Sequence, residues 1–324
     1  MLDQEVTESA DRTEHLKVVP LRRPWRWVSS AVLLVLCAML AHLLVTDPAF
    51  DWHAVARFFT SQAILDGLVV TLELTVLAML IGVALGIVIA VMRLAANPVS
   101  RLVASGYIWF FRGTPALVQL LFWYNLASLL PRLSLGIPFG PIFLSAQSNS
   151  VMTPLVAALF GLGLNEGAYM AEIVRAGILS VDHGQIEAAH SLGMTPGKTM
   201  RRIVLPQAMR VIVPPTGNET IGMLKYTSLA SVISLTELLQ STTIIYDRNF
   251  LVIPLLVVAS LWYLVATTVL SFGQYYLERY YARGGSRPLP PTPLERIRGW
   301  MAFGSDTANA RGMRIIEPER GQHG

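Results

Sequence analysis

The sequence predicts an all-α, polytopic integral membrane protein with about six transmembrane helices. Hydrophobic residues make up 53% of the 324 residues, whereas Asp, Glu, Lys and Arg together make up only 14%. Soluble domains are roughly one quarter charged, and a chain of this length has too little interior to hide so much apolar surface from water. The apolar residues form long continuous runs rather than alternating segments of ~10 residues, which argues against an outer-membrane β-barrel. A soluble enzyme, a disordered regulator and a coiled coil are excluded by the same composition.

The predicted spans are apolar runs, most of which approach or exceed the ~20 residues that a helix needs to cross the hydrocarbon layer. They cover residues 29–46, 67–92, 113–130, 153–175, 211–235 and 250–273. The first run follows a cluster of Arg and Trp side chains typical of an interfacial anchor. We predict that it is a retained helix, because it is long and no clear cleavage site follows it; a cleaved signal sequence is the alternative.

Lys and Arg residues are distributed unevenly between the two sides of the predicted bundle. Of the 25 such residues, 21 fall within 1–28, 93–112, 175–210 and 276–324, which share one side of the membrane. Because Lys and Arg concentrate in cytoplasmic loops, both termini are predicted to be cytoplasmic. The basic charge therefore reflects orientation in the membrane and not a surface for nucleic acid.

Signals for catalysis, cofactors or metal are missing from the sequence. The segment 193–199 has three residues between its glycines, whereas a phosphate-binding loop needs four, and no apolar strand precedes it. The six histidines show no metal-binding spacing, and no Ser, His and Asp set could converge. The single cysteine, Cys37, excludes an internal disulfide and a cysteine-ligated metal. We predict that the chain is not an enzyme and holds no cofactor or metal.

The cytoplasmic loop 176–210 is predicted to contain two short helices. Residues 185–192 favour a first helix, with Gly193 placed to end it. Thr195 and Pro196 provide a cap and a first-turn proline for a second helix, with Pro206 beyond its end. The second helix carries a basic face made of Lys198, Arg201 and Arg202. Two short helices joined by a glycine would form a rigid knob that a partner protein can grip.

Several motifs in this loop and around it carry a resemblance to a known family. Glu187-Ala188-Ala189, three residues, Gly193, nine residues and Ile203-Val204-Leu205-Pro206 resemble the signature EAA loop of ABC importer permeases. Phe111-Arg112-Gly113-Thr114-Pro115 resembles the FRGTP box of the polar amino acid uptake permeases, and further matches lie at 168–173, 175–178 and 224–229. The resemblance covers residues 64–280. It departs from shorter family members in the extra helix at 29–46 and in polar tails at 1–28 and 281–324, the latter Pro-rich at 283–298.

The resemblance implies a type I ABC importer permease fold and a transport function. It implies a permease subunit of the bacterial inner membrane that moves polar amino acids inward. Cytoplasmic ATPase subunits would engage the loop through Glu187, Ala188, Ala189 and Gly193, with the basic face touching the ATPase or anionic lipid. An extracytoplasmic binding protein would deliver substrate, and a second permease copy or a close relative would complete the path. The role of the box Arg112, Gly113, Thr114 and Pro115 stays open between structure and gating.

Polar residues within predicted spans are costly in a membrane and therefore indicate a substrate pathway. In the fourth span Asn165, Tyr169 and Glu172 share one helical stripe, and Glu166 lies deep within the span. In the fifth span Asn218, Lys225 and Ser228 share a face, and Pro214, Pro215 and Gly217 are expected to interrupt its beginning. Glu166 and Lys225 could meet the ammonium and carboxylate groups of an amino acid. The alternative is that these residues pair with neighbours and only hold the bundle together.

Other residues favour structural roles. Glu172 and Arg175 are expected to form an i,i+3 ion pair, Glu73 is expected to be interfacial, and Gly82 and Gly86 fit close helix packing. Three alternatives to amino acid import stay open: an ABC permease for another small solute such as an opine or a compatible solute, an ATP-independent carrier or channel, and a membrane-anchored sensor or scaffold.

Overall fold

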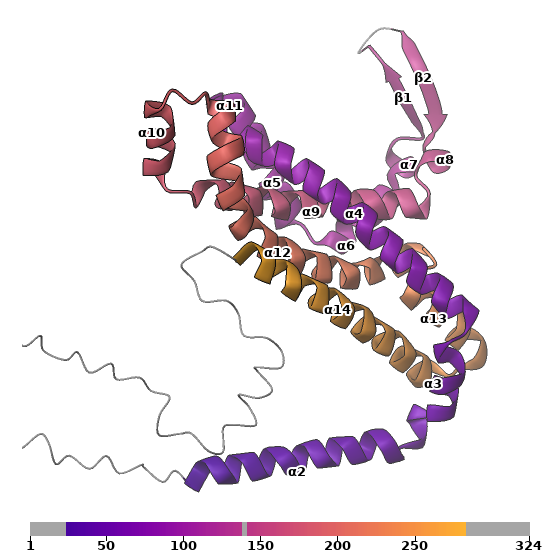
Figure 1. The fold of residues 1–324 in the computed structure, drawn as a ribbon. Helices are drawn as coiled ribbons and strands as arrows, with labels where there is room; N and C mark the ends of the chain where they lie inside the picture. Colours follow the sequence, from indigo (N-terminus) through magenta and orange to yellow (C-terminus); the bar gives the residue numbers. More distant parts are fainter. Residues whose placement is uncertain (1–23, 138–140, 283–324) are drawn as a thin grey trace, which may run out of the picture.

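The computed structural model describes residues 24–137 and 141–282. The predicted tails at 1–28 and 281–324 therefore lie largely outside the described residues, and the Pro-rich segment 283–298 lies outside them entirely. Most of the described part is helical (Figure 1). Its elements in chain order are α2 (Pro24–Thr46), η1 (Pro48–Phe50), α3 (Trp52–Phe59), α4 (Gln62–Leu94), α5 (Pro98–Gly113), α6 (Ala116–Tyr124), α7 (Leu126–Leu129), β1 (Arg132–Gly136), β2 (Ile142–Gln147), α8 (Ser148–Val151), α9 (Pro154–Leu179), α10 (His183–Ser191), α11 (Pro196–Thr199), η2 (Met200–Val204), α12 (Leu205–Tyr226), η3 (Thr227–Ile233), α13 (Leu238–Asn249) and α14 (Val252–Ala282).

The long helix α4 forms the centre of the bundle and packs along α9. Gly82 and Gly86 of α4 allow this close approach, as their spacing predicts. A Cβ atom on Gly86 would lie 2.4 Å from Cβ of Met170 in α9. The largest core cluster joins α4, α6, α9 and α12 through buried apolar side chains, among them Leu74, Ala78, Leu120, Leu162 and Met223.

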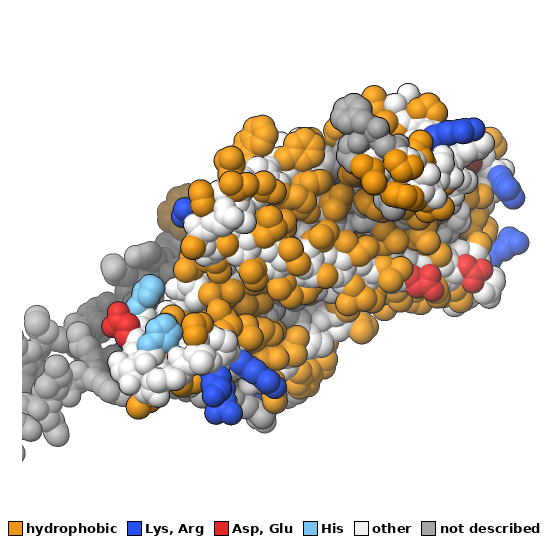
Figure 2. All heavy atoms as spheres, turned by 90° about the horizontal axis from the view of Figure 1, so that it is seen from above, with side chains coloured by type: hydrophobic (Ala, Val, Ile, Leu, Met, Phe, Trp, Pro, Cys, Tyr) orange, Lys and Arg blue, Asp and Glu red, His pale blue; other side chains and the backbone are white. Residues whose placement is uncertain are grey.

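The distribution of side chains on the surface is that of a membrane-embedded protein. Figure 2 shows hydrophobic side chains over the middle of one face, with charged and histidine side chains toward its two ends. Among the described residues, three helices are long and apolar enough to cross a membrane: Trp27–Thr46, Gln62–Leu94 and Val252–Tyr281. A fourth results if Pro196–Ile233 and Leu238–Asn249, bent by 45° at their break, count as one span. The remaining predicted spans coincide with α9 and with the short helices α6 and α7.

The third predicted span, 113–130, is not one continuous helix. It contains the last residue of α5, then the Thr114-Pro115 break, the nine-residue helix α6 and the short helix α7. Pro115 has no N–H to continue the hydrogen bonding of α5 and takes an extended conformation, with φ −63° and ψ 134°. The membrane domain is therefore divided at the FRGTP box.

Two prolines at 214 and 215 were expected to interrupt the fifth span, and this expectation is wrong. Both lie inside the continuous helix α12. Pro206 lies beyond the second loop helix α11, as expected, and sits in the first turn of α12, where its missing N–H is tolerated. The π-helical turn η2 joins α11 to α12, and the N–H of Leu205 bonds the carbonyl of Met200.

Two segments stand apart from the bundle (Figure 1). Strands β1 and β2 form an antiparallel hairpin that pairs Arg132 with Gln147, and nothing in the sequence analysis predicted it. Helix α2 coincides with the predicted extra helix at 29–46, and none of its described side chains is buried. An apolar helix with no packed face needs lipid or another protein around it.

Candidate functional site

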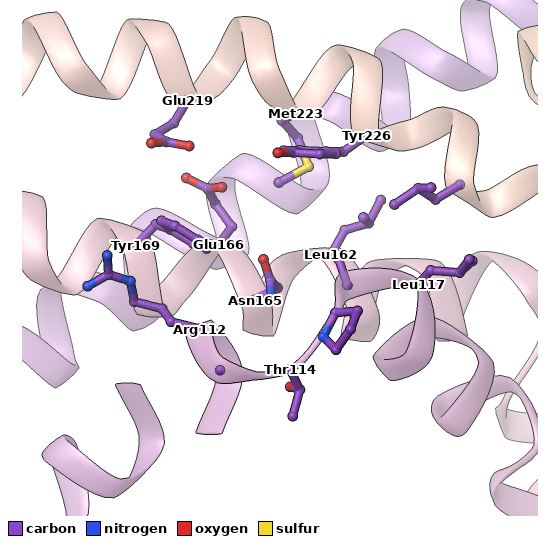
Figure 3. Close-up of a pocket in the computed structure, with 14 residues that line it drawn as sticks. Arg112, Thr114, Leu117, Leu162, Asn165, Glu166, Tyr169, Glu219, Met223 and Tyr226 are labelled. Carbon is purple, nitrogen blue, oxygen red and sulfur yellow. The ribbon is translucent and has the colours of Figure 1, made fainter. Parts of the chain in front are cut away.

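A cavity of about 510 Å³ opens between the α5–α6 break, α9 and α12 (Figure 3). Its size is within the range of small-molecule sites. It is lined by Arg112, Gly113, Thr114, Pro115, Ala116, Leu117, Leu162, Asn165, Glu166, Tyr169, Glu219, Met223, Tyr226 and Leu229. The cavity therefore combines a polar end, formed by α9, the FRGTP box and Glu219 of α12, with an apolar end.

Hydrogen bonds to the carbonyl group of Phe111 hold the FRGTP box in place. Pro115, in the same box, leaves this carbonyl without a backbone N–H partner. In a helix, the carbonyl of Phe111 would accept the N–H of residue 115, but Pro115 has none. The side-chain amide of Asn165 donates to this oxygen at 2.8 Å, and that of Gln119 donates at 2.9 Å. Gln119 also donates to Oγ1 of Thr114 at 2.7 Å. Asn165 thus ties α9 to the break, which supports a structural role for at least this part of the box.

Three charged side chains stand around the polar end of the cavity. Glu166 is 3% exposed, and its Oε1 has no hydrogen-bond partner among the described residues. Glu219 is half-buried on α12, and the two carboxylate groups point toward one another in Figure 3. The guanidinium carbon of Arg112 lies 5.1 Å from the ring centroid of Tyr169, in cation–π contact. The cavity therefore presents two acidic groups and one basic group.

The structure brings together most, but not all, of the residues predicted for the pathway. Asn165, Glu166 and Tyr169 line the cavity together with the last four residues of the FRGTP box, Arg112 to Pro115. The three residues predicted on α12 and η3 do not. Asn218 faces α14, where its Oδ1 accepts from Nε2 of Gln274 at 3.0 Å. Lys225 is exposed, and the hydroxyl of Ser228 donates to the carbonyl of Lys225 at 2.7 Å.

The residues predicted for α12 from the sequence lie on a face next to the one that lines the cavity. The residues of α12 and η3 that line the cavity are Glu219, Met223, Tyr226 and Leu229, which recur at intervals of three and four residues. Asn218 and Lys225 lie one position away from this stripe and so point elsewhere. A signal was available, since Glu219 is a carboxylate within a membrane helix and is a functional candidate on the same grounds as Glu166.

Close packing against α14 fixes the rotation of α12. A Cβ atom on Gly217 would lie 2.7 Å from Cδ of Gln274, so the two helices touch at this glycine. Gln274 also donates to the carbonyl of Pro214, at 3.2 Å. Gly217 and Pro214 thus serve the α12–α14 contact, and Glu219 is turned toward the cavity.

The loop between α9 and α12 forms the predicted knob. The helix α10 ends at Ser191, and Gly193 follows two residues later with a φ of +74°. The N–H of Met194 donates to the carbonyl of Ala189 at 3.0 Å and that of Gly193 to His190 at 2.9 Å, as in a Schellman motif. Glu187 and Ala188 are exposed, whereas Ala189 is buried against the rest of the loop.

The remaining charges of the loop are also accessible. Lys198, Arg201 and Arg202 are all exposed, so the predicted basic face exists. The predicted ion pair at the end of α9 is present as well: a guanidinium nitrogen of Arg175 lies 2.7 Å from Oε2 of Glu172. Glu172 therefore has a partner of its own and is not part of the cavity lining.

The family model for the binding-protein-dependent transport system inner membrane component matches residues 82–283, more than half of the chain. The chain belongs to this family. An arginine transport system permease protein from Corynebacterium glutamicum is 44% identical over 298 residues, which cover 91% of this chain and 92% of that protein. A histidine/lysine/arginine/ornithine transport system permease protein from Salmonella typhimurium is 36% identical over 230 residues, or 70% of this chain and 96% of that protein.

Chains in solved structures of ABC transporters share the fold. A chain in the crystal structure of an amino acid ABC transporter with histidines is 38% identical, has a TM-score of 0.58 and covers 67% of this chain and 94% of its own length. A chain of a methionine ABC transporter in an inward-facing conformation has a TM-score of 0.50 at 19% identity, which shows the likeness of fold alone.

Proposed function

We propose that the chain is the permease subunit of an ABC importer that moves polar amino acids inward, with a preference for those with a cationic side chain. The observation that carries the preference is the charge set of the cavity: the two carboxylates of Glu166 and Glu219 and the guanidinium of Arg112. A cationic amino acid carries two positive groups and one carboxylate, which is the opposite set. The arginine and histidine/lysine/arginine/ornithine permeases among the relatives support the same class.

In this proposal the pocket residues have distinct tasks. Glu166 and Glu219 meet the cationic groups of the substrate, and Arg112, held over Tyr169, meets its carboxylate. Oε1 of Glu166 is a buried acceptor that a bound ammonium or guanidinium group would satisfy. Asn165 acts indirectly, because its hydrogen bond to the carbonyl of Phe111 holds the FRGTP box in position. Asn218, Lys225 and Ser228 lie outside the cavity lining. They stay candidates for another part of the substrate pathway, where they would contact other helices or a second permease.

The knob provides the coupling to ATP hydrolysis in a separate subunit. Exposed Glu187 and Ala188, with the buried Ala189 and the turn at Gly193, would seat in a groove of a cytoplasmic ATPase. Because α11, η2 and α12 follow one another without a gap, a displacement of the knob would move the face of α12 that carries Glu219 and Tyr226. Closure of the ATPases would thus switch the cavity between inward-facing and outward-facing states.

The surroundings of the permease follow from the same assignment. The chain would lie in the bacterial inner membrane as a multi-pass protein with both termini cytoplasmic, as its Lys and Arg distribution predicts. It would work with an extracytoplasmic amino acid binding protein, two ATPase subunits and a second permease, either a copy or a relative. ATP hydrolysis belongs to the ATPase partner, so no catalytic residue, metal or cofactor is assigned to this chain.

The test is uptake by the importer assembled with its ATPase and binding protein in proteoliposomes. Labelled arginine, lysine, glutamine and glutamate form the panel, with an opine to represent other solutes. We expect Glu166→Gln and Glu219→Gln each to lower uptake of arginine and lysine at least tenfold, the equivalent of about 1.4 kcal/mol. The matched control is Glu172→Gln, because Glu172 is paired with Arg175 away from the cavity. Equal loss for all amino acids, or none for arginine and lysine, would contradict the cationic preference.

A further inference from the structure

Glu237 is a completely buried carboxylic acid that lies outside the cavity lining, at 0% exposure. It occupies the joint between η3 and α13, where the chain bends by 45°. The joint also contains Ser234, whose φ of +61° is in the left-handed region. A non-glycine residue in this region costs roughly 1–2 kcal/mol, so the surrounding contacts must hold the bend in place.

The carboxylate of Glu237 gathers donors from three helices. It caps α13 by accepting the N–H of Leu239 at 2.9 Å and that of Gln240 at 2.8 Å. The hydroxyl of Tyr263, on α14, donates to Oε2 at 2.8 Å. The hydroxyl of Thr71, on α4, lies 3.4 Å from Oε2 and accepts the N–H of Leu238 at 3.0 Å. These partners are all neutral, and each hydrogen bond favours the ionised form of the carboxyl group.

The contact between α4 and α13 is as close as the one between α4 and α9. A Cβ atom on Gly67 would lie 2.3 Å from Oγ of Ser241 and 3.0 Å from the carbonyl oxygen of Glu237. Gly67 and Thr71 are one turn apart on the helix whose later residue Gly82 packs against Glu166. One helix therefore holds Glu237 near its beginning and the pocket carboxylate Glu166 farther along.

The joint is also connected to the other side of the cavity. The short helix η3 leads directly from α12 to Glu237, and Tyr226 and Leu229 at their junction line the cavity. Ile233, at the end of η3, is buried in the core cluster that contains Leu162 and Met223, which also line the cavity. A change in the position of the joint would therefore shift the residues at the apolar end of the cavity.

We propose that Glu237 is a positioning residue of the transport cycle. It fixes the η3–α13 joint to α4 and α14 at once, and through this joint it sets the positions of Tyr226 and Leu229 against the polar end of the cavity. This inference rests on the proposed function, because it assigns Glu237 a role in shaping that same cavity. A carboxylate is suited to the task since both of its oxygens accept, whereas the amide of glutamine would offer one acceptor and turn donors toward the N–H and O–H groups around it.

Three variants separate the cap from the links to other helices. Glu237→Asp keeps the charge and the ability to cap α13, but its shorter side chain cannot also reach Tyr263. Tyr263→Phe removes only the α14 donor. Glu237→Gln removes the charge at constant size. The control is Ser234→Gly, which keeps the bend because glycine adopts positive φ without strain.

The experiment measures the concentration dependence of arginine uptake and the substrate-stimulated ATPase rate of the assembled importer, with thermal unfolding measured on the same samples. We expect Glu237→Asp and Tyr263→Phe to raise the KM for uptake at least fivefold at nearly unchanged unfolding temperature, Glu237→Gln to raise it further, and Ser234→Gly to match the unaltered chain. A KM that is unchanged in all three variants, with or without a lower unfolding temperature, would overturn the proposal. If the unaltered importer takes up no amino acid on the panel, it is the proposed function that fails.

Discussion

Gly82 of α4 leaves the space that the side chain of Glu166 occupies. A Cβ atom on Gly82 would lie 2.4 Å from Cγ and 2.7 Å from Cβ of Glu166, distances that side chains do not tolerate. The backbone of α4 therefore forms the wall behind this carboxylic acid, and Figure 3 shows its carboxylate directed toward Glu219. The orientation of a pocket residue on α9 thus depends on the smallest residue of a neighbouring helix.

Replacing Gly82 by alanine is expected to impair transport. The added methyl group must push Glu166 or separate α4 from α9, and such overpacking costs typically 1–3 kcal/mol. Gly106→Ala is the matched control, because no atom lies within 4 Å of a Cβ at that position on α5. Uptake and thermal unfolding of both variants would be compared in the same membrane mimetic. Equal behaviour of the two variants would show that α4 and α9 are not packed as described.

Gly193→Ala tests the turn that ends α10. No neighbour would obstruct the new Cβ, so its effect comes from the positive φ of +74°, with a cost of roughly 1–2 kcal/mol. We expect a weaker link between ATP hydrolysis and transport, measured as fewer substrate molecules moved per ATP. Gly197→Ala, in the same loop, also meets open space but has no positive φ, and it should leave this ratio unchanged. A full ratio in Gly193→Ala would contradict a requirement for this turn in coupling.

The carbonyl of Phe111 provides a test of the FRGTP box. Gln119 and Asn165 both donate to it, so replacing either one by leucine leaves the other donor in place. We expect each single change to be mild and the double change to cost about 1–3 kcal/mol beyond their sum, because a buried acceptor is then left unsatisfied. Unfolding of the four proteins of this double-mutant cycle in detergent would measure the difference. Strict additivity would mean that the two amides do not share this oxygen.

Tyr169 is expected to matter through its ring. Phenylalanine at this position keeps a π face beneath the guanidinium of Arg112, whereas leucine fills similar space without one. We therefore expect uptake by Tyr169→Phe to stay close to that of the unaltered importer, and uptake by Tyr169→Leu to fall severalfold. If phenylalanine and leucine lower uptake equally, the hydroxyl group and not the cation–π contact is what transport requires.

Much of the fold could be predicted from features within single segments. Long apolar runs predicted the helices α2, α4 and α14. Gly193 predicted the end of α10, because glycine readily adopts the positive φ found there. The spacing of Gly82 and Gly86 predicted close packing of α4 against another helix, but which helix could not be known. The start of α6 is also a local effect, because Pro115 ends the hydrogen bonding of α5. Hydrophobic run length did not predict that the third span divides again at Asn125, between α6 and α7.

The candidate site was predictable on one side only. Asn165 and Tyr169 were grouped by helical periodicity, and Glu166 was selected for its depth in the same span. The periodic stripe also included Glu172, which lies outside the cavity lining. Arg112 was assigned to the FRGTP box and not to the substrate pathway, and Lys225 was expected to supply the cation that Arg112 places in the cavity. Glu219 and Tyr226 belong to the same helix as Lys225 but point in another direction.

The sequence by itself thus determined the class of protein, most of the helical spans, the knob and the polar stripe of α9, because each depends on residues close together in the chain. Tertiary structure decided which face of α12 meets the cavity and which groups satisfy the carbonyl of Phe111. Both depend on contacts between segments far apart in sequence, Gly217 with Gln274 and Phe111 with Asn165. No periodicity within a helix encodes its rotation about its own axis; packing against a neighbour fixes that rotation.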